Sequence, residues 1–231
     1  MQPIPRRLWQ IAGGLALAHV VLILLGIFLQ NGPLFSDGIQ GIEDDYVGGD
    51  LARSFTGGLV ESFGFLLLIA VLTFLAGAVG RSSEAARWAS RTGLACGLAY
   101  VAVTFAVGFP AGGAAMYGAQ HGLDVDTAFA LNNVRLFGYF LSLLLLGGST
   151  LGFAAAALAD RVHTGWFGKF GLVSGVVLLA STPLAAIGQQ DWGTLVWSVW
   201  FVGVGVLMLR HREAVEQSAV SAAPRETVGH D

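Results

Sequence analysis

The chain has 231 residues, of which 55% are hydrophobic and 12% charged, about half the charged share of a typical soluble domain. A mean hydropathy of +0.69 indicates an integral membrane protein and excludes an ordinary soluble domain. The net charge of −3 is too small to favour nucleic acid as a partner. Cys96 is the only cysteine, so an intrachain disulfide is excluded.

Six apolar segments, each close to the length that crosses a bilayer, follow one another along the chain. They cover residues 8–29, 57–79, 92–109, 131–158, 170–187 and 192–209. The first exceeds the apolar core of a signal peptide and is interpreted as an uncleaved helix. The predicted fold is therefore an all-α bundle of six transmembrane helices in residues 1–210, followed by a polar, disordered tail, 211–231.

The connections between these segments are predicted from their polar composition. Residues 30–56 form a Gly-rich acidic loop, and residues 111–130 form a mixed loop that has room for one short interfacial helix. Pro110 is expected to end the third helix, because proline removes a helical hydrogen bond and clashes with the preceding turn.

The basic residues predict the orientation. With the N-terminus inside, ten of the twelve Lys and Arg residues fall on the cytoplasmic side, the distribution expected of cytoplasmic loops. Both termini are then cytoplasmic, and Arg53 alone lies outside while Arg135 lies in the membrane. The cytoplasmic set is Arg6, Arg7, Arg81, Arg87, Arg91, Arg161, Lys169, Arg210, Arg212 and Arg225.

A short pattern recurs where the chain enters the membrane from the cytoplasmic side. Its shared feature is an interfacial Trp followed by two small residues four apart, which let helices approach closely. The copies are Trp88, Gly93 and Gly97; Trp166, Gly171 and Gly175; and, more faintly, Trp9, Gly14 and Ala18. The pattern suggests three repeated helical hairpins, although shared packing needs alone would also explain it. Val101 is expected to face lipid.

The fourth apolar segment carries a polar stripe. At 100° per residue, Arg135, Gly138, Ser142 and Ser149 fall on one face of the helix. A charge inside a membrane helix is costly and normally faces protein or water. Glu61, at the equivalent position of the second segment, is the one acid at a similar depth.

Three interpretations of Glu61 and Arg135 remain open. In the first, they form a structural ion pair, since pairing stabilises most intramembrane charges, and Asn132 and Asn133 satisfy the remaining hydrogen-bonding groups of the pair. Alternatively, they bind an anionic or protonatable ligand. In the third interpretation, Arg135 extends to the outer surface.

Other polar residues suggest little chemistry. His19 lies in the middle of the first segment, where an interhelical hydrogen bond is more common than a ligand role. Haem is set aside because no second histidine lies at membrane depth. A metal site from His121, Asp124 and Asp126 in the outer loops is a weaker alternative, and no cofactor is identified.

Signatures of catalysis are also missing from the sequence. It contains no H-E-x-x-H, G-x-S-x-G or P-loop pattern. Residues 147–150, Gly-Gly-Ser-Thr, are interpreted as a close helix contact, since no base accompanies the serine. The sequence thus favours a function other than catalysis.

The layout, the Gly-Gly-Leu-Val-Glu61 start of the second segment and residues 161–169, RVHTGWFGK, resemble a group of bacterial membrane proteins defined only as a domain of unknown function. The acidic loop departs from that group. The resemblance implies a six-helix bundle in a bacterial inner membrane and no particular activity. The preferred hypothesis is binding or transport of a small molecule or lipid at the polar stripe. The alternative is a structural or regulatory partner that assembles, as a homo-oligomer for example, through Gly-rich helix faces.

Overall fold

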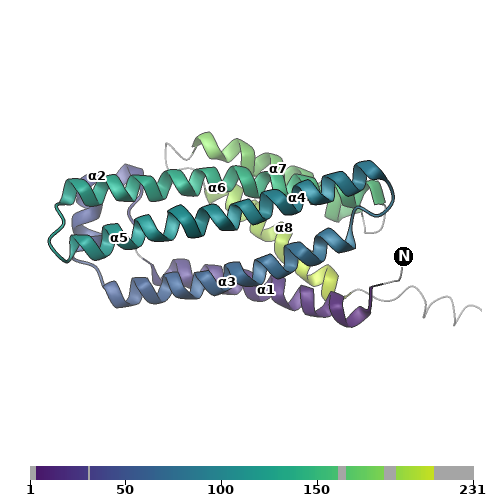
Figure 1. Cartoon of the computed structure of the whole chain (residues 1–231), viewed down its shortest axis with the longest axis horizontal. Coiled ribbons are helices and arrows are strands. Elements are labelled where there is room, and N and C mark those ends of the chain that lie inside the picture. The colour runs from purple at the N-terminus through teal and green to yellow at the C-terminus, as the bar shows by residue number, and fades with distance from the viewer. Residues whose placement is uncertain (1–3, 31, 161–164, 185–190, 211–231) are drawn as a thin grey trace, which may run out of the picture.

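The computed structural model describes residues 4–30, 32–160, 165–184 and 191–210 (Figure 1). These residues form helices and no strand. Six helices are long and apolar enough to cross a membrane, which confirms an all-α fold with six candidate spans. They are α1 (Arg6–Leu29), α3 (Leu51–Ala78), Glu84–Ala119, α6 (Val125–Asp160), α7 (Gly165–Leu184) and Trp192–Leu209 within α8 (Asp191–Leu209). The predicted tail and residues 161–164 of the RVHTGWFGK turn lie outside the described residues.

The six helices form a closed ring in which neighbours in sequence pack together and α8 returns to α1. Helix α1 begins and α8 ends at one end of the bundle, where the turn between α3 and α4 (Glu84–Val103) also lies; we call this the terminal end (Figure 1). The opposite end carries residues 32–50 and the turn between α5 (Phe109–Ala119) and α6, and we call it the loop end.

The third spanning segment continues through Pro110, so the prediction that Pro110 ends this helix is wrong. Between α4 and α5 lies η3, a π-helical turn over Thr104–Gly108. Within it the Phe109 N–H donates to the Thr104 carbonyl, five residues back. The wider turn accommodates a proline that lacks an N–H and would clash with the carbonyl four residues earlier in a regular helix.

Residues 32–50, predicted to be a loop, fold into short helical turns that we call the loop-end cap. The turns are η1 (Phe35–Asp37), α2 (Gly38–Gly41) and η2 (Ile42–Val47). Ile42 and Tyr46 of the cap are buried against Ala115 and Met116 of α5 and Ala128 of α6. These contacts explain why α5 and α6 extend as ordered helices through residues expected to be a loop.

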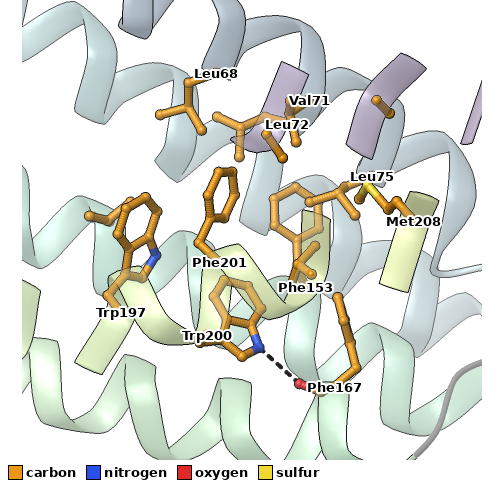
Figure 2. Packing of buried hydrophobic residues seen from close by; sticks show 14 of the residues in the cluster. Leu68, Val71, Leu72, Leu75, Phe153, Phe167, Trp197, Trp200, Phe201 and Met208 are labelled. Carbon is orange, nitrogen blue, oxygen red and sulfur yellow. Dashed lines mark hydrogen bonds between the residues drawn. The ribbon is translucent and has the colours of Figure 1, made fainter. Parts of the chain in front are cut away.

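The main core lies between the spans and is rich in aromatic side chains (Figure 2). Trp200, Phe153 and Phe201 are its largest fully buried side chains. The Trp200 Nε1–H donates to the Phe167 carbonyl at 3.0 Å, and the Trp197 Nε1–H donates to Thr150 Oγ1 at 3.1 Å. Each indole therefore buries its ring and still satisfies its N–H, as buried tryptophans usually require.

Glycines bring neighbouring helices into backbone contact. A Cβ on Gly152 of α6 would lie 2.7 Å from Gly93 Cα of α4, and one on Gly147 would lie 3.3 Å from the Gly175 carbonyl of α7. Gly97 and Gly171 are equally tight, so Gly93, Gly97, Gly171 and Gly175 all face neighbouring helices as predicted. Gly14 of the fainter copy is exposed and a Cβ there meets no atom within 4 Å, so that copy of the pattern does not make the predicted contact.

The expectation that Val101 faces lipid is wrong, because its side chain is 4% exposed. It lies four residues after Gly97, and residues four apart share one face of a helix. The buried face that contains Gly97 therefore contains Val101 as well.

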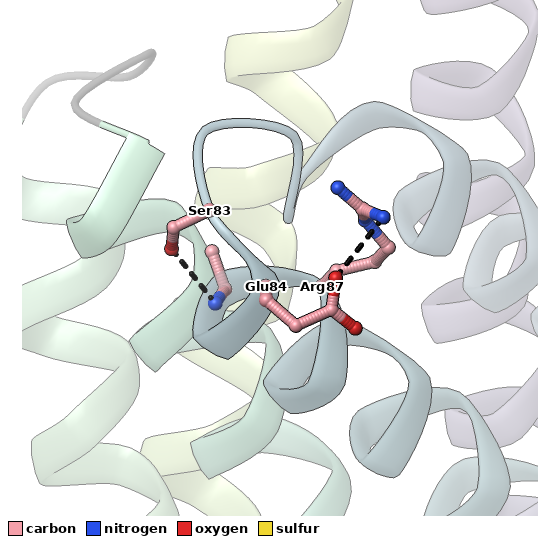
Figure 3. Close-up of polar contacts among 4 residues, drawn as sticks. Ser83, Glu84 and Arg87 are labelled. Carbon is pink, nitrogen blue, oxygen red and sulfur yellow. Dashed lines mark hydrogen bonds and ion pairs between the residues drawn. The ribbon is translucent and has the colours of Figure 1, made fainter.

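At the terminal end, the Asp160 carboxylate organises the turn between α3 and α4. It accepts the backbone N–H groups of Gly80 at 2.6 Å, Arg81 at 2.8 Å and Ser82 at 2.8 Å. Gly80 has a φ of 84°, which glycine adopts without strain. The turn then leads into α4, where the Ser83 hydroxyl caps the helix by accepting the Ala86 N–H (Figure 3).

Candidate functional site

A cavity of about 510 Å³ lies toward the loop end, between α3 on one side and η3, α5 and α6 on the other. Helices α3 and α4 meet at their connecting turn at the terminal end (Figure 1). The cavity lies between α3 and α5 near the loop end. Its wall combines apolar side chains, small residues and a few polar groups, the usual composition of a ligand pocket. The polar members are Gln30, Tyr46, Ser54, Glu61, Ser62, Thr104, Arg135, Tyr139 and Ser142.

Arg135 enters the cavity from α6 and is held at two points. Its Nε–H donates to Asn132 Oδ1 at 2.9 Å, and its Nη2 donates to the Pro33 carbonyl at 2.7 Å. The side chain fits because Gly112 and Gly32 flank it: a Cβ on Gly112 would lie 2.6 Å from Arg135 Cδ. A guanidinium has five N–H groups; Asn132 and Pro33 accept two of them, and the Tyr46 hydroxyl also lies within reach of the guanidinium.

Asn132, fully buried, connects Arg135 to the loop-end cap. Its Oδ1 also accepts the Tyr46 hydroxyl at 2.8 Å, and its Nδ2 donates to the Pro33 carbonyl at 3.1 Å. Burial raises the pKa of Tyr46, and the positive charge of Arg135 opposes that rise. The tyrosine is therefore a neutral hydrogen-bond donor at physiological pH. The network fixes the guanidinium before any ligand arrives.

Glu61 enters the cavity from α3, on the other side. Its Oε2 accepts Gln30 Nε2 at 2.7 Å, whereas Oε1 has no hydrogen-bond partner among the described residues. The residue is half-buried and lines the cavity. Its backbone is held by a close contact of α1 with α3, since a Cβ on Gly26 would lie 2.7 Å from Glu61 Cβ.

Glu61 and Arg135 line one cavity without forming a direct ion pair. No carboxylate oxygen of Glu61 comes within 4.0 Å of the Arg135 guanidinium in the described structure. The predicted structural lock between the second and fourth helices is thus replaced by two charges held separately, one by Gln30 and the other by Asn132 and Pro33. Asn132 joins the site as expected, whereas Asn133 does not, and its buried Oδ1 has no partner among the described residues.

The polar stripe of α6 faces the third spanning segment, as expected for a stripe turned away from lipid. Ser142 lines the cavity and donates to the Tyr139 carbonyl at 2.6 Å. Gly138 lies against Val107, and the buried Ser149 lies against Gly97. The stripe is therefore half cavity wall and half helix contact.

His19 lies outside the cavity. Its Nδ1–H donates to the Gly64 carbonyl of α3 at 2.8 Å, and its ring contacts Phe65, Trp197 and Phe201. This is the interhelical hydrogen bond that the sequence favoured over a ligand role.

The weaker hypothesis of a metal site gains no geometric basis. No group of three metal-ligating side chains occurs among the described residues. His121 stacks on Tyr117 and donates to its carbonyl at 2.7 Å. Hydrogen bonds from the side chain and the backbone of Thr127 lower the pKa of Asp124, which serves as a cap where α6 begins.

Several cavity residues carried no signal in the sequence. Gln30 closes an apolar run, and Tyr46 follows three acidic residues, so neither stood out from a solvated loop. The π turn that supplies Thr104 and Gly108 could have been suspected from Pro110, since π turns often accompany functional sites. Gly58 lies in the Gly-Gly-Leu-Val-Glu61 motif, where it faces open space in the cavity.

No protein-family model, curated protein or solved structure matches this chain.

Proposed function

We propose that this chain is a multi-pass protein of a bacterial inner membrane that binds, and on that basis transports or presents, a small molecule or a lipid. The observation that carries the proposal is a cavity lined by two charged side chains of opposite sign, neither of which has a counter-ion within 4.0 Å in the part of the chain that the structure describes. Intramembrane charges that lack a protein partner are expensive, and they typically mark ligand or ion sites.

The proposed orientation has both termini in the cytoplasm and the cavity toward the outside. It is supported by the basic side chains Arg6, Arg81, Arg91, Lys169 and Arg210, which belong to the terminal end of the bundle. Basic residues concentrate on the cytoplasmic side of membrane proteins. The acidic cap would then face the exterior.

The three-hairpin repeat stays part of this proposal. The hairpin of α1 with α3 and the hairpin that ends in α6 place Glu61 and Arg135 at corresponding positions, and both residues reach the same cavity. Such placement is what a duplicated hairpin would produce.

The alternative, assembly through small-residue faces, has less support. The glycines that would form such a face contact neighbouring helices inside the bundle, as Gly93, Gly147 and Gly175 do. Gly14 and Gly77 are exposed, but they lie singly on different helices.

The test is purification in native lipid, followed by mass spectrometry of bound molecules, for wild type and Gly58→Leu. A Cβ at Gly58 would meet no atom within 4 Å, and the residue lies on the cavity wall, so we expect a leucine there to extend into the cavity. Gly14→Leu is the matched control, because that position is equally open but faces away from the cavity. We expect a bound molecule with wild type and Gly14→Leu and its loss with Gly58→Leu. Equal retention by all three proteins contradicts a role for the cavity.

The orientation has its own test. Tags before Met1 and after Asp231 should be protected in right-side-out vesicles, and a tag beside Asp45 should be accessible. Asp45 suits the insertion because it lies in the loop-end cap, outside the candidate spans. An accessible C-terminal tag contradicts the six-span topology.

A further inference from the structure

Resting on the proposed function, we infer that the ligand is a zwitterionic lipid whose headgroup carries an oxyanion and a primary ammonium. Arg135 holds the oxyanion, Glu61 holds the ammonium, and the acyl chains leave the cavity along the lipid-facing side of α3.

The anion subsite is the guanidinium of Arg135. Asn132 and the Pro33 carbonyl occupy two of its five N–H groups and hold its plane in place, which leaves further N–H groups on the Nη atoms for a ligand. An arginine whose plane is already fixed binds carboxylate or phosphate oxygens through paired hydrogen bonds and loses little further side-chain entropy. Ser142 and Thr104 lie on the same wall, but their hydroxyls donate to the Tyr139 and Tyr100 carbonyls, so the guanidinium is the donor of this subsite.

The cation subsite is the Glu61 carboxylate. The Gln30 amide donates to Oε2, which leaves Oε1 to accept from a ligand. A primary ammonium provides three donors, whereas a quaternary ammonium provides none, so this subsite distinguishes the two.

The charges of the cavity match a zwitterion better than an anion. Glu61 is the only acid and Arg135 the only base among the described residues that line it. A purely anionic headgroup would leave the carboxylate without a counter-charge beside a second negative group, which is costly in a partly desolvated site. A headgroup with both charges neutralises both side chains.

The mouth of the cavity favours a lipid over a water-soluble zwitterion. Phe55 and Leu59 line the cavity and are 43% and 60% exposed. Phe63 and Leu66 are 54% and 53% exposed, and they follow Leu59 at intervals of four and seven residues, the spacing of one helix face. An apolar track thus starts at the charged site and runs along α3 toward the middle of the span, where an acyl chain can lie.

The experiment measures binding to the purified full-length protein by native mass spectrometry in neutral detergent. The probes are phosphatidylethanolamine, phosphatidylcholine and phosphatidylglycerol with identical acyl chains, and the water-soluble glycerophosphoethanolamine. We expect phosphatidylethanolamine to bind about tenfold more tightly than the other two lipids, the ratio that one charge-assisted hydrogen bond provides. Glycerophosphoethanolamine, which lacks the chains, should bind far more weakly.

Two variants assign the subsites. Glu61→Gln should abolish the preference for phosphatidylethanolamine over phosphatidylglycerol and leave phosphatidylglycerol binding intact. Arg135→Gln should weaken both lipids about tenfold, since it removes the shared phosphate contact. If Arg135→Gln does not yield folded protein, lipid binding is measured with Arg135→Lys instead, which keeps the positive charge. Gly14→Leu is the control that should bind as wild type does.

The outcomes separate this inference from the proposed function. Equal binding of the three lipids, with loss in Gly58→Leu, overturns the zwitterion but keeps the cavity as a binding site. Binding of glycerophosphoethanolamine as tight as that of the lipid overturns the lipid source. If Gly58→Leu binds the lipids as tightly as wild type does, both proposals are overturned.

Discussion

The two ends of the bundle are held together in different ways. Toward the terminal end, aromatic side chains and glycine contacts fill the space between helices, and the largest buried residues, Trp200 and Phe153, belong to this part. Toward the loop end, a cavity lies between α3 and α5, and polar side chains connect the cap to α6.

The difference shows how a membrane bundle can contain a polar cavity and stay folded. Helices in lipid gain little from hydrophobic burial against one another and rely on close packing and interhelical hydrogen bonds. Here close packing dominates one half, whereas the hydrogen bonds of Asn132 and Arg135 dominate the other. Substitutions in the two halves should therefore fail for different reasons.

The largest effect is expected where two helix backbones touch. In Gly152→Leu the new Cβ would lie 2.7 Å from Gly93 Cα and from the Ala89 carbonyl, which cannot move aside without separating α4 from α6. We expect a loss of at least about 3 kcal/mol of unfolding free energy, the upper part of the range for overpacked cores, measured by thermal unfolding in detergent. Gly14→Leu should melt within a few degrees of wild type. Equal melting temperatures for the two variants would contradict the packing account of the terminal half.

The next loss, at the lower limit of that for Gly152→Leu, is about 3 kcal/mol for Arg135→Gln, because two hydrogen bonds from a charged donor are removed. The cap should then become sensitive to protease. Glu61 and Arg135 form no ion pair within 4.0 Å, so the double variant Glu61→Gln/Arg135→Gln should lose at least as much as Arg135→Gln alone. A double variant more stable than Arg135→Gln alone would reveal a direct pair that the structure does not show.

Asp160→Asn tests whether the hydrogen bonds of the Asp160 carboxylate stabilise the turn between α3 and α4 at the terminal end. The carboxylate serves three backbone N–H groups, and an amide offers one acceptor oxygen and no charge, so we expect a loss of about 1–3 kcal/mol. The control is Glu84→Gln, which removes the exposed pair with Arg87 at 3.1 Å (Figure 3). Exposed pairs contribute at most about 1 kcal/mol. Comparable losses in the two variants would show that Asp160 does not organise the turn.

Much of the fold was predictable because apolar length is a direct requirement of the bilayer. Six segments of sufficient length give six candidate spans, and spacing alone identified the contact glycines of α4 and α7 but wrongly included Gly14 of α1. The ends of the helices were not predictable. Leu51 and Val125 begin their helices earlier than expected because the cap and α5 bury polar-looking sequence that composition assigns to loops.

The site was predictable in its charges and not in its shape. Glu61 and Arg135 stood out because intramembrane charges are rare, and both line the cavity. Their separation depends on Gln30 and Pro33, which reach the two charges from the end of α1 and the cap. A sequence without long-range contacts gives no reason to place these residues there. The π turn likewise depends on how Pro110 is accommodated, which local propensity does not determine.

The smallest expected effect concerns Tyr46, which links the cap to α6 through Asn132. Tyr46→Phe leaves Asn132 Oδ1 with its hydrogen bond from Arg135, so the loss should be only about 1 kcal/mol. The variant is most informative when the stability of the cap is measured as a function of pH, because burial raises the pKa of Tyr46 above its ordinary value of 10.0.

A raised pKa means that the unfolded chain releases this proton before the folded chain does. The contribution of Tyr46 is therefore complete below pH 10.0 and is lost as the pH rises through the folded-state pKa. Arg135 opposes the rise in pKa and Asp45 adds to it. Limited proteolysis of the cap should accelerate in strongly alkaline buffer for wild type, with a smaller acceleration for Tyr46→Phe, which has no phenol to ionise. Identical alkaline profiles would mean that the Tyr46 hydroxyl does not hold the cap, and that apolar burial of Ile42 is enough to close the loop end.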